Sequence, residues 1–225
     1  DTVGVDGDYL GLFGFMEGGG REIVVNLGVE GGTVTGGDGS RYLGGLCGYN
    51  WYGTIDGCHT VVAVAGGDSS QAVGGLCGYN YGGLVSNSHA TGAVAVGGTS
   101  AGVGGLCGTN WQGTLSGCYA TGAVSGGADV KYVGGLCGEV TSDYSGYPGG
   151  VIQDCYARGA VSGGAGSASV GGLCGDSYES YISGCHAEGT VTAEIDSQET
   201  GGLCGSEFRG EIDGCHATGN VVGDW

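Results

Sequence analysis

Hydrophobic and polar positions along this chain recur with a fixed period. The segment Gly-Gly-Leu-Cys-Gly occurs six times, beginning at residues 44, 74, 104, 134, 171 and 201. Each copy is followed by an apolar residue, two spacers and a cysteine or serine, and then by Ala-x-Gly-x-Val or a variant of it. The spacing is 30 residues except in one repeat, where it is 37. Such a period is typical of a solenoid in which each repeat forms one coil.

Within each repeat, the residues that follow the second cysteine alternate with a period of two. Cys118, Ala120, Gly122 and Val124 are small or apolar, whereas the residues between them are mixed and, in other repeats, polar or charged. This alternation indicates a β-strand with one buried face. A glycine in every repeat opposes the alternative, an α-helix. The sequence therefore predicts an all-β protein, a parallel β-solenoid of about seven coils with a narrow core.

We expect a single solenoid domain over residues 1–225. Residues 44–225 hold six regular repeats, and residues 1–43 form a degenerate first coil in which Leu12 and Phe13 match the Leu-Cys pair. The long repeat has its extra residues between its cysteines, because Cys137 and Cys155 are 18 positions apart where the other pairs are 11 apart. A solenoid absorbs such an insertion in a surface loop, which we place at residues 141–150.

The cysteines fall into two columns of equivalent positions. The first is Cys47, Cys77, Cys107, Cys137, Cys174 and Cys204, and the second is Cys58, Ser88, Cys118, Cys155, Cys185 and Cys215. The simplest pairing lies within each coil and predicts five disulfides, Cys47–Cys58, Cys107–Cys118, Cys137–Cys155, Cys174–Cys185 and Cys204–Cys215, with Cys77 left as an unpaired thiol. Pairing along a column competes with it, although the five cysteines of the second column cannot all pair that way. Persistent disulfides require an oxidising compartment, which predicts an extracellular or cell-surface location.

The repeat resembles a known motif. The pattern Gly-Gly-Leu-x-Gly-x-Asn-x-x-Gly-x-Ile, followed by Ala-Thr-Gly-x-Val-x-Gly, is similar to the GLUG motif over roughly residues 10–223. The resemblance implies a bacterial secreted or cell-surface β-solenoid without catalytic residues of its own. The chain departs from the usual motif by placing cysteine where an aliphatic residue is common, which favours unusual durability.

Composition and charge narrow the function classes further. The chain has 59 glycines among its 225 residues and a net charge of −18. That charge repels nucleic acids and anionic lipids, and no run of about 18–20 apolar residues predicts a membrane span. The acidic residues look scattered along the sequence, and the metal-binding spacing Cys-x-x-Cys is absent. We therefore expect no enzyme activity, no metal and no cofactor.

Three outward-facing columns are candidates for binding. One holds all four histidines (His59, His89, Tyr119, Tyr156, His186, His216), and we interpret it as an aromatic ladder that stabilises the stacking of coils rather than as a metal site. A second holds Trp51, Tyr81 and Trp111, for which turn packing is favoured over contact with sugars or another subunit. The third (Val61, Thr91, Thr121, Arg158, Glu188, Thr218) is interrupted by charges, which disfavours ice binding.

Two features predict self-association. The first and last coils carry apolar residues in place of polar caps, namely Phe13, Phe15, Met16, Val221, Val222 and Trp225. A leucine precedes the first cysteine of every regular coil (Leu46, Leu76, Leu106, Leu136, Leu173, Leu203), and this column is either an exposed apolar stripe or part of an inward-facing corner. We expect a structural protein that forms a homopolymer by end-to-end or lateral contacts. The alternative is a monomeric adhesin that binds a surface glycan or host ligand.

Overall fold

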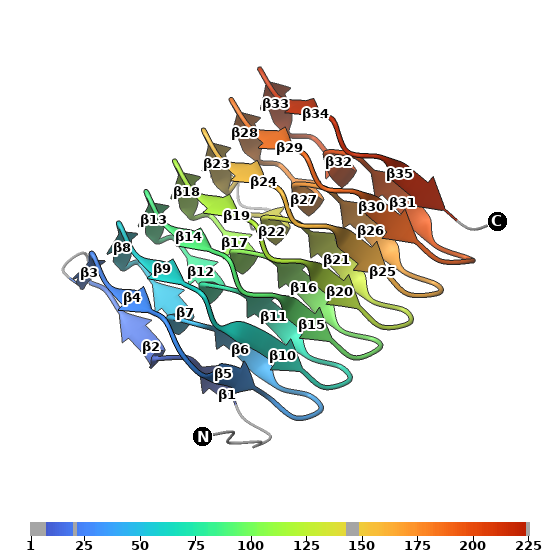
Figure 1. The fold of residues 1–225 in the computed structure, drawn as a ribbon. Helices are drawn as coiled ribbons and strands as arrows, with labels where there is room; N and C mark the ends of the chain where they lie inside the picture. The colour runs from blue at the N-terminus through green and yellow to red at the C-terminus, as the bar shows by residue number, and fades with distance from the viewer. Residues whose placement is uncertain (1–7, 20–21, 143–148, 224–225) are drawn as a thin grey trace.

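The protein is a parallel β-solenoid of seven coils. The computed structural model describes residues 8–19, 22–142 and 149–223. All regular elements of these residues are β-strands, which stack in parallel from the first coil to the last (Figure 1). Each coil contributes one strand to each of five seven-stranded sheets, so that coil 1 holds β1–β5, coil 2 holds β6–β10 and coil 7 holds β31–β35. The fold predicted from the repeat is confirmed.

The first two sheets form one corner of each coil. Sheet 1 contains β1 (Asp8–Leu10), β6 (Arg41–Gly44), β11 (Gln71–Gly74), β16 (Ala101–Gly104), β21 (Lys131–Gly134), β26 (Ala168–Gly171) and β31 (Gln198–Gly201). Sheet 2 contains β2 (Phe13–Glu17), β7 (Cys47–Trp51), β12 (Cys77–Tyr81), β17 (Cys107–Trp111), β22 (Cys137–Thr141), β27 (Cys174–Tyr178) and β32 (Cys204–Phe208). A two-residue bend joins the two strands in each coil.

The remaining sheets close the coil. Sheet 3 contains β3 (Ile23–Val25), β8 (Thr54–Asp56), β13 (Leu84–Ser86), β18 (Thr114–Ser116), β23 (Val151–Gln153), β28 (Tyr181–Ser183) and β33 (Glu211–Asp213). Sheet 4 contains β4 (Gly28–Val29), β9 (His59–Thr60), β14 (His89–Ala90), β19 (Tyr119–Ala120), β24 (Tyr156–Ala157), β29 (His186–Ala187) and β34 (His216–Ala217). Sheet 5 contains β5 (Thr33–Thr35), β10 (Ala63–Gly66), β15 (Val94–Val96), β20 (Val124–Gly126), β25 (Val161–Gly163), β30 (Val191–Ala193) and β35 (Val221–Gly223).

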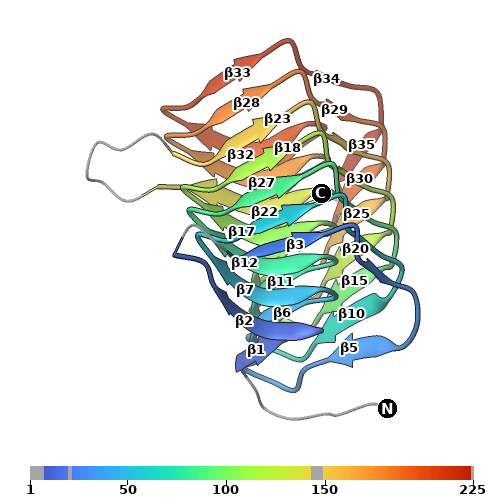
Figure 2. The ribbon, with the colours of Figure 1, turned by 90° about the vertical axis from the view of Figure 1, so that its left-hand side faces the viewer.

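Equivalent residues of successive repeats lie opposite each other across the strands, and Figure 2 shows the coils in this stacked order. The degenerate first coil follows the same register, since Phe13 pairs with Cys47. After the long repeat, Val151 pairs with Thr114, so the coil returns to phase beyond its insertion. Residues 143–148 of the predicted insertion loop lie outside the described residues, as does Trp225.

Two narrow cores run along the solenoid. One, between sheets 2, 3 and 4, holds the leucines and cysteines together with an isoleucine or valine column and an alanine column. The other, between sheets 1 and 5, consists of valines and one leucine. The largest fully buried side chains are leucines and isoleucines. This agrees with the prediction of a narrow core without large aromatic filler.

The leucine column lies in the core, so the inward-facing corner is confirmed as the correct alternative, and the column is not an exposed apolar interface. Leu46, Leu76, Leu106, Leu136 and Leu173 are 0% exposed, and Leu203 is half-buried. The chain bends at Gly105 and Leu106 between β16 and β17, and the carbonyl oxygen of Leu136 accepts the backbone amides of both Leu106 (2.8 Å) and Cys107 (3.0 Å). This bend interrupts the alternation of the strand, and neighbouring leucine and cysteine side chains therefore both turn inward.

A buried asparagine ladder supports sheet 2. Asn50 donates its Nδ2 hydrogen to Oδ1 of Asn80 at 2.8 Å, and Asn80 donates to Asn110 in the same way at 2.8 Å. The second hydrogen of Asn80 Nδ2 goes to the carbonyl oxygen of Gly83 at 3.0 Å, which closes the turn that follows the strand. All three asparagines are 0% exposed. Asn80, in the middle of the column, has both its amide hydrogens and its amide oxygen satisfied, whereas Asn50 at the start of the column keeps an Oδ1 atom without a partner.

Candidate functional site

Two columns of residues lie on the outer side of the corner between sheets 1 and 2, and the surface between them, which holds one pocket, is called the groove below. One of its columns consists of residues in the left-handed backbone conformation in the middle of the sheet 1 strands: Tyr9, Tyr42, Ala72, Gly102, Tyr132, Ser169 and Glu199. The other column lies on the outer face of sheet 2: Phe15, Tyr49, Tyr79, Thr109, Glu139, Asp176 and Ser206. Contacts between these columns are described below, and they make the corner a candidate binding surface.

The first three coils supply the aromatic part of the groove. The ring of Tyr42 meets Tyr49 edge-on with ring centroids 5.1 Å apart, and it meets Tyr79 in the same manner at 5.4 Å. Tyr49 and Tyr79 stack on each other at 5.0 Å. Tyr9 stacks on Tyr42 at 5.1 Å and touches Phe15 edge-on at 5.7 Å. These rings form one continuous aromatic surface that ends at the fourth coil, with Tyr9 and Phe15 exposed and the other three rings half-buried.

A pocket of about 140 Å³ lies where the aromatic part meets the acidic part. Small residues form its floor, because the left-handed column carries Ala72 and then Gly102 at this point. Tyr42 and Tyr79 stand on one side of it and Tyr132 and Glu139 on the other. A Cβ atom at Gly102 would lie 2.6 Å from Oγ1 of Thr109, so the missing side chain keeps the pocket open. The pocket combines aromatic rings, hydroxyl groups and a carboxyl group.

The later coils supply the acidic part of the groove. Glu139 pairs with Asp176 across β22 and β27, and Glu199 of the left-handed column accepts a hydrogen bond from Ser169 at 2.7 Å. Burial raises the pKa of Glu139 to about 7, and the neighbouring carboxyl of Asp176 adds to this effect. Burial also raises the pKa of Asp176 above its usual range. Three of the 23 acidic residues, Glu139, Asp176 and Glu199, therefore lie close together on this surface, although they are far apart in the sequence.

Stability should fall with rising pH because of Glu139. A carboxyl whose pKa is raised in the folded protein binds more protons there than in the unfolded chain between about pH 4.5 and pH 7. The stabilisation is complete below that window and is lost as the pH rises through it. The free energy of unfolding should fall by roughly 2 kcal/mol across the window, after allowance for partial exposure. We expect Glu139→Gln to remove most of this dependence when urea unfolding is compared at pH 5.5 and pH 8. An unchanged dependence in Glu139→Gln, matching that of the exposed-site control Glu188→Gln, would contradict the assignment.

The histidine column is a stacked ladder, as the sequence predicted. Successive rings of His59, His89, Tyr119, Tyr156, His186 and His216 lie nearly parallel, with centroids 4.5–5.2 Å apart. Among the described residues, no group of three or more His, Cys, Asp or Glu side chains is arranged to hold a metal ion. In the threonine column, Arg158 and Glu188 form an ion pair at 3.0 Å.

The second aromatic column has mixed exposure. Trp51 is 39% exposed, whereas Tyr81 and Trp111 are half-buried. The Trp51 ring lies 6.2 Å from Tyr52, whose ring contacts Tyr81 at 5.4 Å. The column thus packs against the residues of its own turns.

Exposed apolar side chains concentrate in the two end coils. Ten of the sixteen exposed large apolar residues lie there: Tyr9, Leu12, Phe13, Phe15, Ile23, Val25, Phe208, Ile212, Val221 and Val222. Ile212 is 40% exposed, although its register partner Ile182 is 0% exposed in the coil before it. A hollow of about 600 Å³ opens beside Val221 in the last coil. Met16 is an exception to the predicted interface, because it is only 6% exposed and packs into the first core.

All eleven cysteines are free thiols in the structure. Nine are buried, and Cys204 and Cys215 in the last coil are half-buried. The five predicted disulfides are therefore not formed in it, and their pairing stays a prediction. Ser88 occupies the position expected for it, since its Oγ accepts the backbone amide of Cys58 at 3.0 Å.

Comparison with known proteins decides the family of the repeat. The family model of the GLUG motif matches residues 69–95 and 99–125, which are two successive repeats of the third and fourth coils. Two repeats of this chain match the GLUG motif. The match supports the resemblance noted from the glycine-leucine segment, and the register shows that the other coils stack in the same way.

A solved structure shares the fold of the GLUG solenoid. It is the crystal structure of a proposed immunoglobulin A1 protease from Bacteroides ovatus, with a TM-score of 0.54 and 20% sequence identity. The alignment covers 87% of this chain and 67% of that protein. At this identity the likeness concerns the fold alone. No curated protein sequence matches the chain.

Sequence reasoning missed the groove, although a signal for it was present. Tyr49, Tyr79, Glu139 and Asp176 all stand two positions after the first cysteine of their repeats. Reading that offset as an outward column would have brought the acidic pair together. The left-handed column has no comparable signal, because tyrosine, alanine, serine and glutamate occupy it as well as glycine.

Proposed function

We propose that this GLUG solenoid is an extracellular structural unit that associates end to end with further copies of itself. The GLUG repeat and the β-solenoid fold support a secreted or cell-surface protein. Among the described residues, no helix is long and apolar enough to cross a membrane. The repeat and the fold favour a scaffold, and its function then depends on which molecules its surfaces contact.

The exposure of core columns at the end faces carries this proposal. Ile212 and Val221 belong to inward-facing columns whose members in the preceding coil, Ile182 and Val191, are 0% exposed. At the other end, Phe13 occupies the column of the buried Cys47 and is 37% exposed. A further coil would bury these side chains and complete the edge strands of the five sheets. A second copy of this chain supplies such a coil.

Lateral association has less support. The leucine column that suggested it is buried. The net charge of −18 makes side-by-side contacts repulsive at low ionic strength. End-to-end contact is therefore the geometry to test.

Placing a charge on an end face should weaken association at least tenfold. Ile212→Asp buries a carboxylate in any end-to-end contact, and such burial is costly without a partner. Ala123→Asp is the matched control, because Ala123 is an exposed outward residue of a central coil. We expect light scattering during size-exclusion chromatography to show oligomers for the wild type and the control, and monomers for Ile212→Asp. Equal masses for all three proteins would refute end-face association.

The groove supports a second candidate, a ligand-binding module. Aromatic rings beside carboxyl groups suit the apolar faces and hydroxyl groups of a sugar, and the pocket of about 140 Å³ is of a size for one ring. This candidate is the adhesin alternative, and its contact residues are Tyr42, Tyr79, Tyr132 and Glu139. It is favoured if the protein stays monomeric.

A further inference from the structure

The two cysteine columns place most thiols directly beside thiols of neighbouring coils. In the first column, Cys77 pairs in register with both Cys47 and Cys107, and Cys137 pairs with Cys107 and Cys174. Cys204 continues the column opposite Cys174. Paired strands place such Cα atoms about 4.8 Å apart. This spacing lies inside the range of about 4.4–6.8 Å found for cysteines joined by a disulfide.

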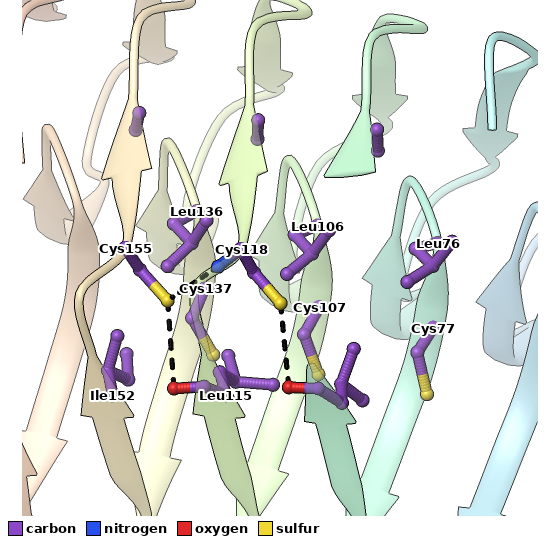
Figure 3. Packing of buried hydrophobic residues seen from close by; sticks show 14 of the residues in the cluster. Leu76, Cys77, Leu106, Cys107, Leu115, Cys118, Leu136, Cys137, Ile152 and Cys155 are labelled. Carbon is purple, nitrogen blue, oxygen red and sulfur yellow. Dashed lines mark hydrogen bonds between the residues drawn. The ribbon is translucent and has the colours of Figure 1, made fainter. Parts of the chain in front are cut away.

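Hydrogen bonds to cysteine sulfur atoms follow the second column. In the second column, the backbone amide of Cys118 donates to Sγ of Cys155 at 3.3 Å, and the amide of Cys155 donates to Sγ of Cys185 at 3.4 Å. The amide of Cys185 donates to Sγ of Cys215 at 3.3 Å. In the first column, the strand register places the buried Cys77 between Cys47 and Cys107. Figure 3 shows Cys77, Cys107 and Cys137 of the first column and Cys118 and Cys155 of the second column in successive coils along the solenoid.

The number of cysteines in each run fixes a single complete pairing. The first column is an unbroken run of six, which pairs completely in only one way, as three neighbouring pairs. Ser88 breaks the second column into a lone Cys58 and a run of four, which again pairs completely in only one way. The one cysteine left without a partner in this pairing is therefore Cys58. Cys58 has Leu27 on one side and Ser88 on the other, and its thiol donates to the carbonyl oxygens of Val24 and Asp56 at 3.4 Å each.

We propose that in an oxidising compartment the cysteines pair along the columns and not within the coils. The bonds are Cys47–Cys77, Cys107–Cys137, Cys174–Cys204, Cys118–Cys155 and Cys185–Cys215, and Cys58 is the free thiol. Each bond forms when two thiols lose two protons and two electrons to a disulfide, either that of an oxidoreductase or glutathione disulfide, which is reduced to two thiols.

This pairing clamps coils to each other, whereas pairing within coils leaves their stacking to hydrogen bonds and packing. Coils 4 and 5 are joined by two bonds, as are coils 6 and 7, and coils 2 and 3 are joined by one. A clamp between coils prevents strand pairs from separating along the axis, which is the direction in which a stacked solenoid opens. The Cys118–Cys155 bond also spans the insertion at residues 141–150, because Cys118 precedes it and Cys155 follows it.

A tryptic map under non-reducing conditions distinguishes the two pairings on the wild-type protein. The protein is exported or oxidised with glutathione disulfide, its free thiols are alkylated under denaturation, and it is cleaved after Arg21, Arg41, Lys131, Arg158 and Arg209. Column pairing links peptide 132–158 to peptide 42–131 through two disulfides. Within-coil pairing instead releases peptide 132–158 alone, closed by Cys137–Cys155. The linked pair is the expected result, and release of peptide 132–158 would overturn the proposal.

The position of the alkyl label gives an independent reading. Further cleavage with chymotrypsin separates Cys58 from Cys77, and we expect at least tenfold more label on Cys58. Cys58→Ser should lose the label and keep the tryptic map of the wild type. Label concentrated on Cys77, or label on all eleven cysteines after oxidation, would each contradict pairing along the columns.

Discussion

Replacing Gly122 by alanine is expected to destabilise the solenoid by about 3 kcal/mol or more. Gly122 is the glycine of the Ala-x-Gly-x-Val segment in the fourth coil. A Cβ atom there would lie 1.9 Å from the carbonyl oxygen of Gly92 in the coil before it, and backbone cannot yield as a flexible side chain does. The coils would have to separate locally, which breaks hydrogen bonds on both sides. Circular dichroism melting should show a loss of about 6–12 °C.

Gly31→Ala is the matched control for this substitution. A Cβ atom at Gly31 meets no atom within 4 Å, and Gly31 is not in the left-handed conformation. Its melting temperature should stay within about 2 °C of the wild type, because exposed substitutions away from special features change stability by about 0.5 kcal/mol or less. Equal melting temperatures for Gly122→Ala and Gly31→Ala would show that the coils are not stacked as closely as described.

Replacing Asn80 by alanine is expected to cost about 2–4 kcal/mol. The change removes the oxygen that accepts a hydrogen bond from Asn50. It also removes the amide group that donates to Oδ1 of Asn110 and to the carbonyl oxygen of Gly83, and all of these groups are buried. Leaving a buried polar group without a partner costs about 1–3 kcal/mol of folding free energy. Three such groups are affected here, and relaxation of the surrounding structure recovers part of that cost. Urea unfolding monitored by fluorescence measures the change in free energy.

Gln153→Ala provides the comparison for Asn80→Ala, because Gln153 lies in an exposed position of β23. Its free energy of unfolding should change by less than about 0.5 kcal/mol. A similarly small change for Asn80→Ala would mean that the asparagine ladder does not hold the turns of sheet 2 together.

The repeat made most of the fold predictable. A fixed spacing between Gly-Gly-Leu-Cys-Gly segments requires each coil to place the same residues at the same points, so the register follows from the period. The degenerate first coil could be aligned because Phe13 and Val24 are apolar where later coils carry Cys47 and Ile55. The alternation after the second cysteine correctly indicated which side chains face inward.

Features that depend on local departures from strand geometry were only partly predictable. The bend at Gly105 and Leu106 turns two consecutive side chains inward, whereas an ideal strand would have exposed one of them, so the sequence left two alternatives for the leucine column. The left-handed residues of sheet 1, such as Tyr42 and Tyr132, direct side chains into the groove, and their residue types do not indicate that conformation. The acidic pair Glu139 and Asp176 was overlooked for a different reason, because the position two residues after the first cysteine was not considered as an outward column.

For the cysteines, the structure adds neighbours that distance along the chain does not suggest. Residues 11 positions apart in a coil are close along the chain, which favoured pairing Cys107 with Cys118. In a stacked solenoid the residue 30 positions away is a direct neighbour, as Cys137 is for Cys107. Both pairings predict five disulfides, so only the identity of the bonds separates them.

Negative-stain electron microscopy of the purified protein at moderate salt tests end-to-end association most directly. Seven coils at about 4.8 Å each give a rod of about 34 Å. We expect filaments many times this length at micromolar concentration, and their loss in Ile212→Asp but not in Ala123→Asp. Dispersed single rods at every concentration would contradict end-to-end association, and would direct attention to the groove around Tyr79 and Glu139 as the working surface of a monomeric binding module.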